Sequence, residues 1–230
     1  QLRIGIPVYR LPRQIIDDEI NVITENRVEI VTGHQISSLE ELKGFDAVFL
    51  AMGAVKPQRL GIPGQELPGV QECVDFLREV NLGHPPAMGR RVAVIGGGNV
   101  AMDGARTALR LGAQEVTIVY RRTRAEMPAY AFEVHAAEQE GVKLMFLASP
   151  VKVSQKGGHL AFHLQRMQLG EPDASGRRRP VPIPGDEFDL PVDNILVAIG
   201  QVTDRFQEWG VELNQDGTIK AVPGIMETSK

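Results

Sequence analysis

The stretch from Val92 to Ala113, VAVIGGGNVAMDGARTALRLGA, constrains the fold of this chain more than any other part of its sequence. A short apolar run precedes three consecutive glycines, and apolar residues then recur at helical spacing. That order predicts a buried β-strand, a tight turn and a helix that packs back onto the strand. Gly96, Gly98 and Ala101 also fit the pattern G-x-G-x-x-G/A, in which the second glycine lets the backbone approach a pyrophosphate.

The residues that follow extend this start into a βαβαβ pattern. Further strands are predicted at EVTIVYRR and VKLMFLAS, with a helix around AFEVHAAEQEG between them. Alternating strands and helices indicate a parallel sheet with right-handed crossovers. We therefore expect an α/β fold with a Rossmann-like domain, whose glycine turn and helix N-terminus bind the phosphates of a dinucleotide.

The second predicted strand ends in arginines, where an NAD site usually presents an acidic side chain to the adenine ribose. Guanidinium groups suit a 2′-phosphate instead, because they supply positive charge and forked donors. Arg121 and Arg122 are therefore predicted to favour NADPH, although the spacing does not show which of them contacts the phosphate. The alternative is a solvated basic face formed by these two residues and Arg124.

Upstream of the glycine turn the pattern is different. We expect a loop over residues 3–12, a helix over 13–26, strands at VEIVTG and DAVFLAMGA, one helical turn opened by Ser38, and a helix at CVDFLREVNLG. Downstream, two period-two runs around Gly157 and Gly158 predict a β-hairpin or meander. The segment EPDASGRRRPVPIPGDE is expected to be a polar excursion, and NILVAIGQ a last apolar strand.

Composition and charge exclude several classes of function. The net charge of −4 argues against a general nucleic-acid surface. The single cysteine, Cys73, excludes an internal disulfide framework and leaves too few thiolates for a zinc or iron–sulfur site within this chain, and no metal site is expected. No apolar run approaches the roughly 20 residues of a membrane helix, and no signal peptide is apparent. We expect a cytoplasmic protein. The five histidines lack metal-ligand spacing and a partnered base, so no histidine is expected to be catalytic.

Five segments together resemble the small subunit of NADPH-dependent glutamate synthase and its relatives, which are FAD-dependent oxidoreductases of the pyridine nucleotide-disulfide type. Those relatives include domains of dihydropyrimidine dehydrogenase and the large subunit of NADH-dependent ferredoxin:NADP oxidoreductase. The segments occur in the family's order and span nearly the whole chain: GIPVYRLPR, LAMGAVKPQRLGIPG, VAVIGGGNVAMDGARTALRLGA, VTIVYRRTRAEMPA and ILVAIGQ.

The resemblance implies an FAD-binding domain into which an NADPH-binding domain is inserted, with an iron–sulfur region before both. Residues 61–200 would form the NADPH-binding domain, and residues 1–60 and 201–230 would be remnants of the FAD-binding domain, since the family's two FAD motifs are missing here. We therefore expect a fragment that binds NADPH but is inactive alone. Unpaired strand edges in the remnants would favour self-association.

The full-length parent implied by the resemblance passes reducing equivalents from NADPH through FAD and iron–sulfur clusters to a partner. That partner would be the glutamate synthase large subunit or another electron-accepting subunit. Because the cofactors would carry the chemistry, no catalytic side chain is expected. The alternatives are a related ferredoxin:NADP oxidoreductase or sulfide dehydrogenase subunit, and a non-catalytic NADP-sensing domain.

The resemblance also implies roles for individual residues. The pyrophosphate would be surrounded by Gly96, Gly97, Gly98, Asn99 and Val100, with Ala101 packing beneath. The 2′-phosphate would be held by Arg121 and Arg122, and the nicotinamide side would be bordered by Ala198, Ile199 and Gly200.

Overall fold

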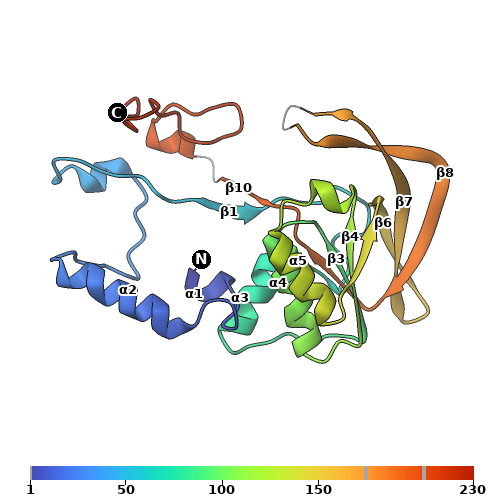
Figure 1. The fold of residues 1–230 in the computed structure, drawn as a ribbon. Coiled ribbons are helices and arrows are strands. Elements are labelled where there is room, and N and C mark those ends of the chain that lie inside the picture. Colours follow the sequence, from blue (N-terminus) through green and yellow to red (C-terminus); the bar gives the residue numbers. More distant parts are fainter. Residues whose placement is uncertain (1, 174–175, 204–205) are drawn as a thin grey trace. The chain divides into compact units, whose positions relative to one another are not determined.

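A computed structural model describes residues 2–173, 176–203 and 206–230 of the chain (Figure 1). They divide into two compact units. The larger comprises the residues up to Asp18 together with 59–199, and the smaller comprises 19–58 and 200–230. The segment that precedes Glu19 therefore packs with the larger unit, so each unit is built from separate stretches of the sequence.

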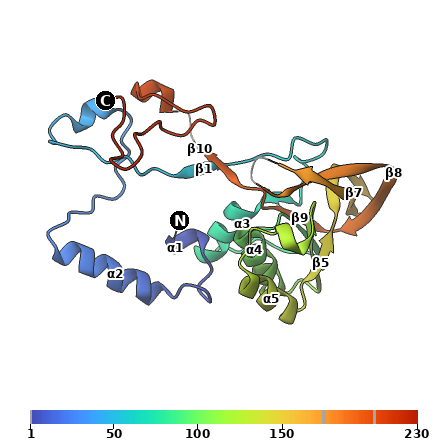
Figure 2. The same ribbon diagram turned by 45° about the horizontal axis from the view of Figure 1, so that its top comes forward.

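Five strands of the described chain form the parallel sheet of the larger unit, which confirms the predicted α/β architecture. The strands lie in the order β2 (Val70–Glu72), β9 (Asn194–Val197), β3 (Arg91–Ile95), β4 (Glu115–Tyr120) and β5 (Lys143–Phe146). The crossover helices are α3 (Cys73–Asn81), α4 (Asn99–Arg110) and α5 (Ala131–Gln139) (Figure 2). The segment NILV forms a strand, as predicted, and the structure places it in the sheet between β2 and β3.

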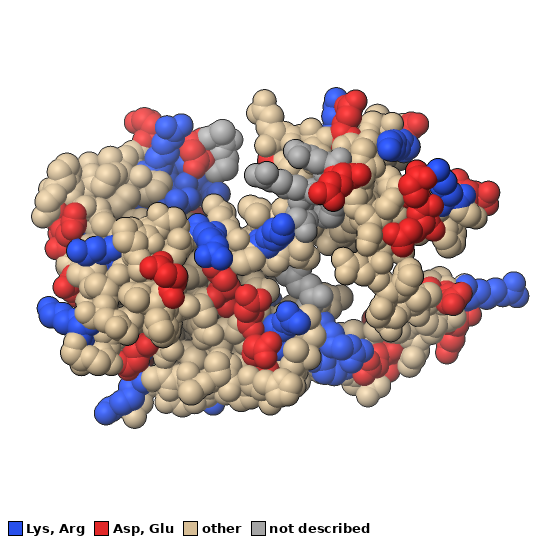
Figure 3. All heavy atoms as spheres, turned by 180° about the vertical axis from the view of Figure 1, so that it is seen from behind, with Lys and Arg blue, Asp and Glu red and all other residues tan. Residues whose placement is uncertain are grey.

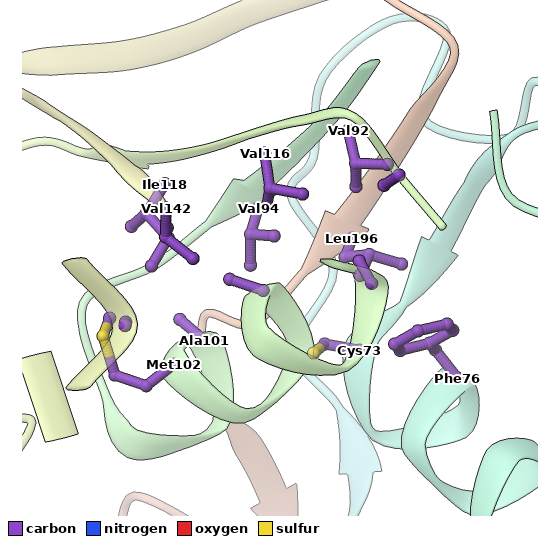
Figure 4. Close-up of a cluster of buried hydrophobic side chains, with 14 of the residues drawn as sticks. Cys73, Phe76, Val92, Val94, Ala101, Met102, Val116, Ile118, Val142 and Leu196 are labelled. Atoms are coloured by element: carbon purple, nitrogen blue, oxygen red, sulfur yellow. The ribbon is translucent and has the colours of Figure 1, made fainter. Parts of the chain in front are cut away.

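Both faces of the parallel sheet are buried, which explains why its central strands β9 and β3 contain the continuous apolar runs ILV and VAVI. Along β3, Val92 and Val94 pack with the helices, whereas Ala93 and Ile95 pack with the antiparallel sheet described next. Figure 4 shows the helix-side cluster, which includes Cys73, Phe76, Met102, Val116, Ile118, Val142 and Leu196. Two hydrophobic cores therefore hold the sheet in place.

The second face of the parallel sheet is covered by an antiparallel meander of β6 (Ala148–Lys156), β7 (His159–Pro172) and β8 (Arg178–Val192). The predicted turn at Gly157 and Gly158 joins β6 to β7, so the predicted hairpin is confirmed. The predicted polar excursion is wrong where the chain is described, because the segment from Arg178 onward forms β8. Proline is tolerated there because β8 is an edge strand.

The N-terminal segment begins with α1 (Leu2–Gly5), where a loop was predicted, and continues into α2 (Arg13–Glu25), which confirms the predicted helix. A short 3-10 turn follows at Leu39–Leu42, opened by a capping box at Ser38 as predicted. No helix among the described residues is long and apolar enough to cross a membrane.

The smaller unit departs most from the sequence-based expectations. The predicted strands VEIVTG and DAVFLAMGA have no strand pairing over residues 28–33 and 46–53. Instead β1 (Ala54–Pro57) pairs antiparallel with β10 (Gln201–Thr203), and a 3-10 turn follows at Phe206–Trp209. A β-strand needs a neighbour for its backbone groups, and the described part of this unit pairs only a few of its residues.

The unpaired segments leave apolar side chains exposed, so we expect self-association that rises with concentration. Phe49 is 78% exposed and Val31 is 67% exposed. Sedimentation velocity should show oligomers at high concentration. Phe49→Asp should reduce their amount, because it replaces an exposed apolar side chain with a charged one. A chain that stays monomeric at high concentration would contradict this expectation.

Candidate dinucleotide-binding site

The glycine turn lies at the carboxyl ends of three neighbouring strands, β3, β4 and β9. The Gly96 N–H donates to the carbonyl oxygen of Val119 at 3.1 Å, and the Ala198 N–H donates to that of Ile95 at 2.8 Å. Gly96 has a φ of 135°, and a Cβ atom there would lie 2.3 Å from the Ala198 carbonyl oxygen. This first glycine is therefore required by the fold itself, for backbone conformation and close packing.

Gly97 is required by a different neighbour. A Cβ atom at this position would lie 2.6 Å from the ring of Tyr120, the last residue of β4. The Tyr120 hydroxyl donates to the Glu126 carbonyl oxygen at 2.7 Å, and the Gly97 carbonyl oxygen accepts from the Ala129 N–H at 3.0 Å. The loop that follows β4 is thus fastened directly to the glycine turn.

Gly98 differs from the two glycines before it, because no protein atom crowds it. The nearest atom to a Cβ placed there is Cγ of Pro128, at 3.9 Å, and its φ is −95°. Gly98 is the N-cap of α4 and makes no side-chain cap. Within the described residues, the N–H groups of Asn99 and Val100 find no acceptor in the protein. The open space beside Gly98 and these free donors together could hold an anion at the N-terminus of the helix.

The helix behind this site is packed closely against its neighbours. Ala101 is completely buried, and its place beneath the phosphates stays a prediction. Gly104 lies against Cys73 of α3, whose sulfur would be 2.2 Å from a Cβ at that position. Burial raises the pKa of the Cys73 thiol, and its Sγ donates to the Val100 carbonyl oxygen at 3.4 Å. The cysteine therefore serves helix packing and is not a reactive thiol.

The two arginines after β4 have different surroundings. Arg121 is exposed, and its side chain forms no hydrogen bond or ion pair with the described part of the protein. Arg122 is only 4% exposed. Its Nη2 lies 2.6 Å from Oδ2 of Asp173, and its Nε donates to the Arg178 carbonyl oxygen at 2.7 Å. Arg124 forms an ion pair with Glu138.

The three residues predicted to border the nicotinamide do not all lie at the glycine turn. Ala198 lies at the glycine turn through its carbonyl oxygen, as described above. Ile199 packs at the edge of the core between the parallel sheet and the meander. Gly200 belongs to the smaller unit, where its carbonyl oxygen accepts from the Gln58 N–H at 3.0 Å. Of these three residues, the larger unit brings Ala198 to the turn.

A buried ion cluster, which the sequence patterns did not suggest, holds the N-terminal segment against α4 and α5. Arg10 Nη1 lies 2.6 Å from Oδ2 of Asp103, and Arg10 Nε lies 2.7 Å from Oε1 of Glu133. Burial raises the pKa of Asp103 to about 6, although Arg10 opposes this shift. Asp103 interrupts the apolar face of the predicted helix, and that interruption was the signal available in the sequence.

Tyr9 extends the same cluster. Its ring lies under the guanidinium groups of Arg106 and Arg110, which are 4.7 and 3.9 Å from the ring centroid. Burial raises the pKa of Tyr9 to about 12. Arg106 and Arg110 also pair with Glu140 at the end of α5. The segment before α2 is thus attached to the helices that carry the candidate site.

Three side chains on the meander are connected in the order serine, histidine, carboxylate. Oγ of Ser154 lies 2.8 Å from Nε2 of His163, whose Nδ1 lies 2.5 Å from Oδ1 of Asp189. They stand side by side on β6, β7 and β8, and the backbone of the central strand β7 is paired with strands on both sides. We interpret this array as a cross-strand hydrogen-bond network that stabilises the meander.

Comparison with known proteins gives one family and several relatives. Residues 10–229 match the family model described as pyridine nucleotide-disulphide oxidoreductase. The chain is 47% identical to the NADP(+)-dependent formate dehydrogenase subunit beta of Moorella thermoacetica, in an alignment that covers 99% of this chain and 34% of that protein. It is 46% identical to the NADPH-Fe(3+) oxidoreductase subunit beta of Geobacter sulfurreducens (88% and 32% covered). It is 38% identical to the glutamate synthase [NADPH] small chain of Halomonas elongata (96% and 50%).

The fold also matches solved structures. FprA, an oxidoreductase of Mycobacterium tuberculosis, superposes with a TM-score of 0.79 at 23% identity, over 98% of this chain and 66% of that one. This likeness supports the α/β fold. The chain spans about a third to a half of the length of the three curated relatives named above.

Proposed function

The chain belongs to the pyridine nucleotide-disulphide oxidoreductase family, and on that premise we propose that it is the NADPH-binding part of a flavin-dependent oxidoreductase. In the whole protein it would pass reducing equivalents from NADPH through FAD to a partner subunit. Three relatives carry names of beta or small subunits, which supports a multi-subunit assembly. The iron–sulfur clusters expected in the parent are part of the same proposal.

The observation that carries this proposal is the open space beside Gly98. Gly96 and Gly97 are explained by contacts within the protein, whereas Gly98 is uncrowded and lies next to unpaired backbone donors. A glycine that nothing in the protein requires is accounted for by a ligand that approaches the backbone. A pyrophosphate fits this place, because its charge is stabilised by the N–H groups and dipole at the start of α4.

The remaining residues of the site would orient the cofactor. Arg121 lies at the end of β4, where the adenine ribose of a dinucleotide is bound in this fold, and its free guanidinium suits a 2′-phosphate. Ala198, Ile199 and Gly200 are proposed to border the nicotinamide. When bound, the nicotinamide supplies a hydride to the flavin; this chain's own contribution is to hold the nucleotide in position.

The final electron acceptor is proposed from the relatives. The formate dehydrogenase and Fe(3+) oxidoreductase beta subunits are 47% and 46% identical to this chain, against 38% for the glutamate synthase small chain. This difference favours a partner other than the glutamate synthase large subunit. Reconstitution with candidate partner subunits, followed by NADPH oxidation, would distinguish them.

We expect the chain to bind NADPH at least about tenfold more tightly than NADH, roughly 1.4 kcal/mol, in calorimetric titrations at low salt. Arg121→Ala should remove most of this preference by weakening NADPH binding alone, since NADH has no 2′-phosphate. Arg90→Ala is the matched control. That arginine is also exposed, but it bonds Gln114 at the amino end of the parallel sheet, remote from the glycine turn.

Two results would contradict the proposal in different ways. Equal affinity for NADPH and NADH would refute the role of Arg121. Absence of binding to either nucleotide, by a chain whose circular dichroism shows a folded α/β protein, would refute the dinucleotide site. FAD should be titrated in parallel, because the proposal places the flavin motifs in other parts of the whole protein.

A further inference from the structure

The burial of Arg122 leaves the proposed 2′-phosphate site one cation short. The sequence pattern suggested two arginines, but the guanidinium of Arg122 is 4% exposed and already bonded to Asp173 and to the Arg178 carbonyl oxygen. A phosphate monoester carries nearly two negative charges at neutral pH. Arg121 alone balances one of them, so a second donor of positive charge is expected nearby.

The bonds of Arg122 bring another part of the chain to this place. Asp173 directly follows β7, and Arg178 is the first residue of β8. By contacting both, the single side chain of Arg122 fixes this end of the β7–β8 hairpin beside the residues that follow β4. The Asp173 N–H also donates to the Arg177 carbonyl oxygen at 2.8 Å, which closes the base of the turn.

Arg178 is an exposed cation at this end of the hairpin. Its Nε and Nη2 donate to the carbonyl oxygens of Gly170 and Leu169, at 3.3 and 3.1 Å. These two bonds brace the guanidinium and leave three of its five N–H donors for a ligand. The pKa of Glu126, in the loop after β4, is lowered mainly by the hydrogen bond from the Thr123 hydroxyl. The charge of Arg178 makes a smaller contribution in the same direction.

We propose that Arg178 supplies the second guanidinium to the 2′-phosphate, and that Arg122 is a positioning residue that holds the hairpin so that Arg178 can reach it. This inference rests on the proposed function, since it requires NADPH at the glycine turn. It makes the meander part of the cofactor-selecting site in addition to a cover for the parallel sheet. Braced guanidinium groups bind phosphate well, because little conformational freedom is lost on binding.

The test is calorimetric titration of the whole chain with NADPH and NADH in parallel. Arg178→Ala should weaken NADPH binding about tenfold and leave NADH binding unchanged, whereas Arg178→Lys should restore part of the loss. Asp173→Asn should lower NADPH affinity in the same direction, because it weakens the bond that fixes the hairpin. Arg179→Ala, which removes the next exposed arginine on β8, should change neither affinity more than about twofold.

The outcomes separate this inference from the proposed function. If Arg121→Ala loses the preference for NADPH while Arg178→Ala keeps it, the role of Arg178 is refuted and the proposed function stands. If Arg178→Ala weakens NADPH and NADH equally, its effect is structural and the inference is also refuted. If the unaltered chain binds neither nucleotide, the proposed function and this inference both fail.

Discussion

Replacing Arg10 by alanine is expected to lower the free energy of unfolding by about 3–5 kcal/mol, because it leaves buried carboxylates without their cation. Asp103 is 3% exposed and Glu133 is 4% exposed, and Arg10 contacts both. Glu133 keeps Arg106 as a second partner at 2.8 Å. Oδ1 of Asp103 has no hydrogen-bond partner among the described residues even with Arg10 present. Removal of Arg10 should therefore destabilise Asp103 more than Glu133.

The size of this effect should depend on pH. The pKa of Asp103 is raised by burial to about 6 from an ordinary value of 3.8, so the ionised form is disfavoured in the folded state. Stability associated with this group is therefore fully present below its unfolded pKa and is lost as the pH rises through about 6. Without Arg10 the folded pKa should rise further, and protonation should relieve part of the penalty. The loss in the free energy of unfolding caused by Arg10→Ala should therefore be smaller at pH 5 than at pH 8.

Urea denaturation at these two pH values measures both effects. Arg3→Ala is the matched control, since Arg3 pairs with Asp17 while about half of each side chain remains exposed. Exposed ion pairs contribute at most about 1 kcal/mol, so the control should change little at either pH. A deficit for Arg10→Ala below about 1 kcal/mol at pH 8, or one that is larger at pH 5, would show that the cluster does not hold this segment.

The parallel sheet could be predicted from the sequence because its signals are local. The run VAVI, the glycines and the apolar spacing of α4 lie within 22 consecutive residues, from Val92 to Ala113. Burial on both faces makes such strands apolar at every position, so they stand out without knowledge of their partners. Charged side chains of both signs are interspersed on the face of the molecule in Figure 3.

Strands that depend on partners distant in the sequence were harder to predict. Segments 28–33 and 46–53 are apolar enough for strands, but strand formation requires a paired neighbour, and the described residues supply none. The opposite error occurred from Arg178 onward, where a polar excursion was predicted and a strand that contains Pro180 and Pro182 is found. Pairing of this segment with β7 outweighs the missing N–H donors, because proline is tolerated on an edge strand.

The candidate site likewise contains residues that could be identified from the sequence and residues that could not. The three glycines and Ala101 could be identified from spacing, because close backbone approach permits few other residues. The different surroundings of Arg121 and Arg122 could not, since adjacent residues look equivalent in a sequence. What separates them is Asp173, which lies about fifty residues away along the chain and pairs with Arg122. The Arg10 cluster was missed for the same reason.

Gly98→Ala is expected to weaken NADPH binding by about a hundredfold, or roughly 2.7 kcal/mol, with a smaller effect on the free energy of unfolding. The new methyl group would meet no protein atom closer than 3.9 Å, so the fold accommodates it. Glycine is preferred to alanine at an N-cap, so the exchange should cost about 0.5–1 kcal/mol of stability. The same methyl group would occupy the space that a pyrophosphate requires beside Asn99 and Val100. Calorimetric titration and urea denaturation of the same preparation measure the two effects.

Gly96→Ala provides the matched comparison, because the same change two residues earlier should act mainly on the free energy of unfolding. Its φ of 135° disfavours alanine, and the new Cβ would lie 2.3 Å from the Ala198 carbonyl oxygen. We expect a loss of about 3 kcal/mol or more in the free energy of unfolding. If Gly98→Ala were as destabilising as Gly96→Ala, the space beside Gly98 would be a requirement of the fold. If Gly98→Ala instead left both stability and NADPH affinity unchanged, no pyrophosphate would lie there, and the observation on which the proposed function depends would be lost.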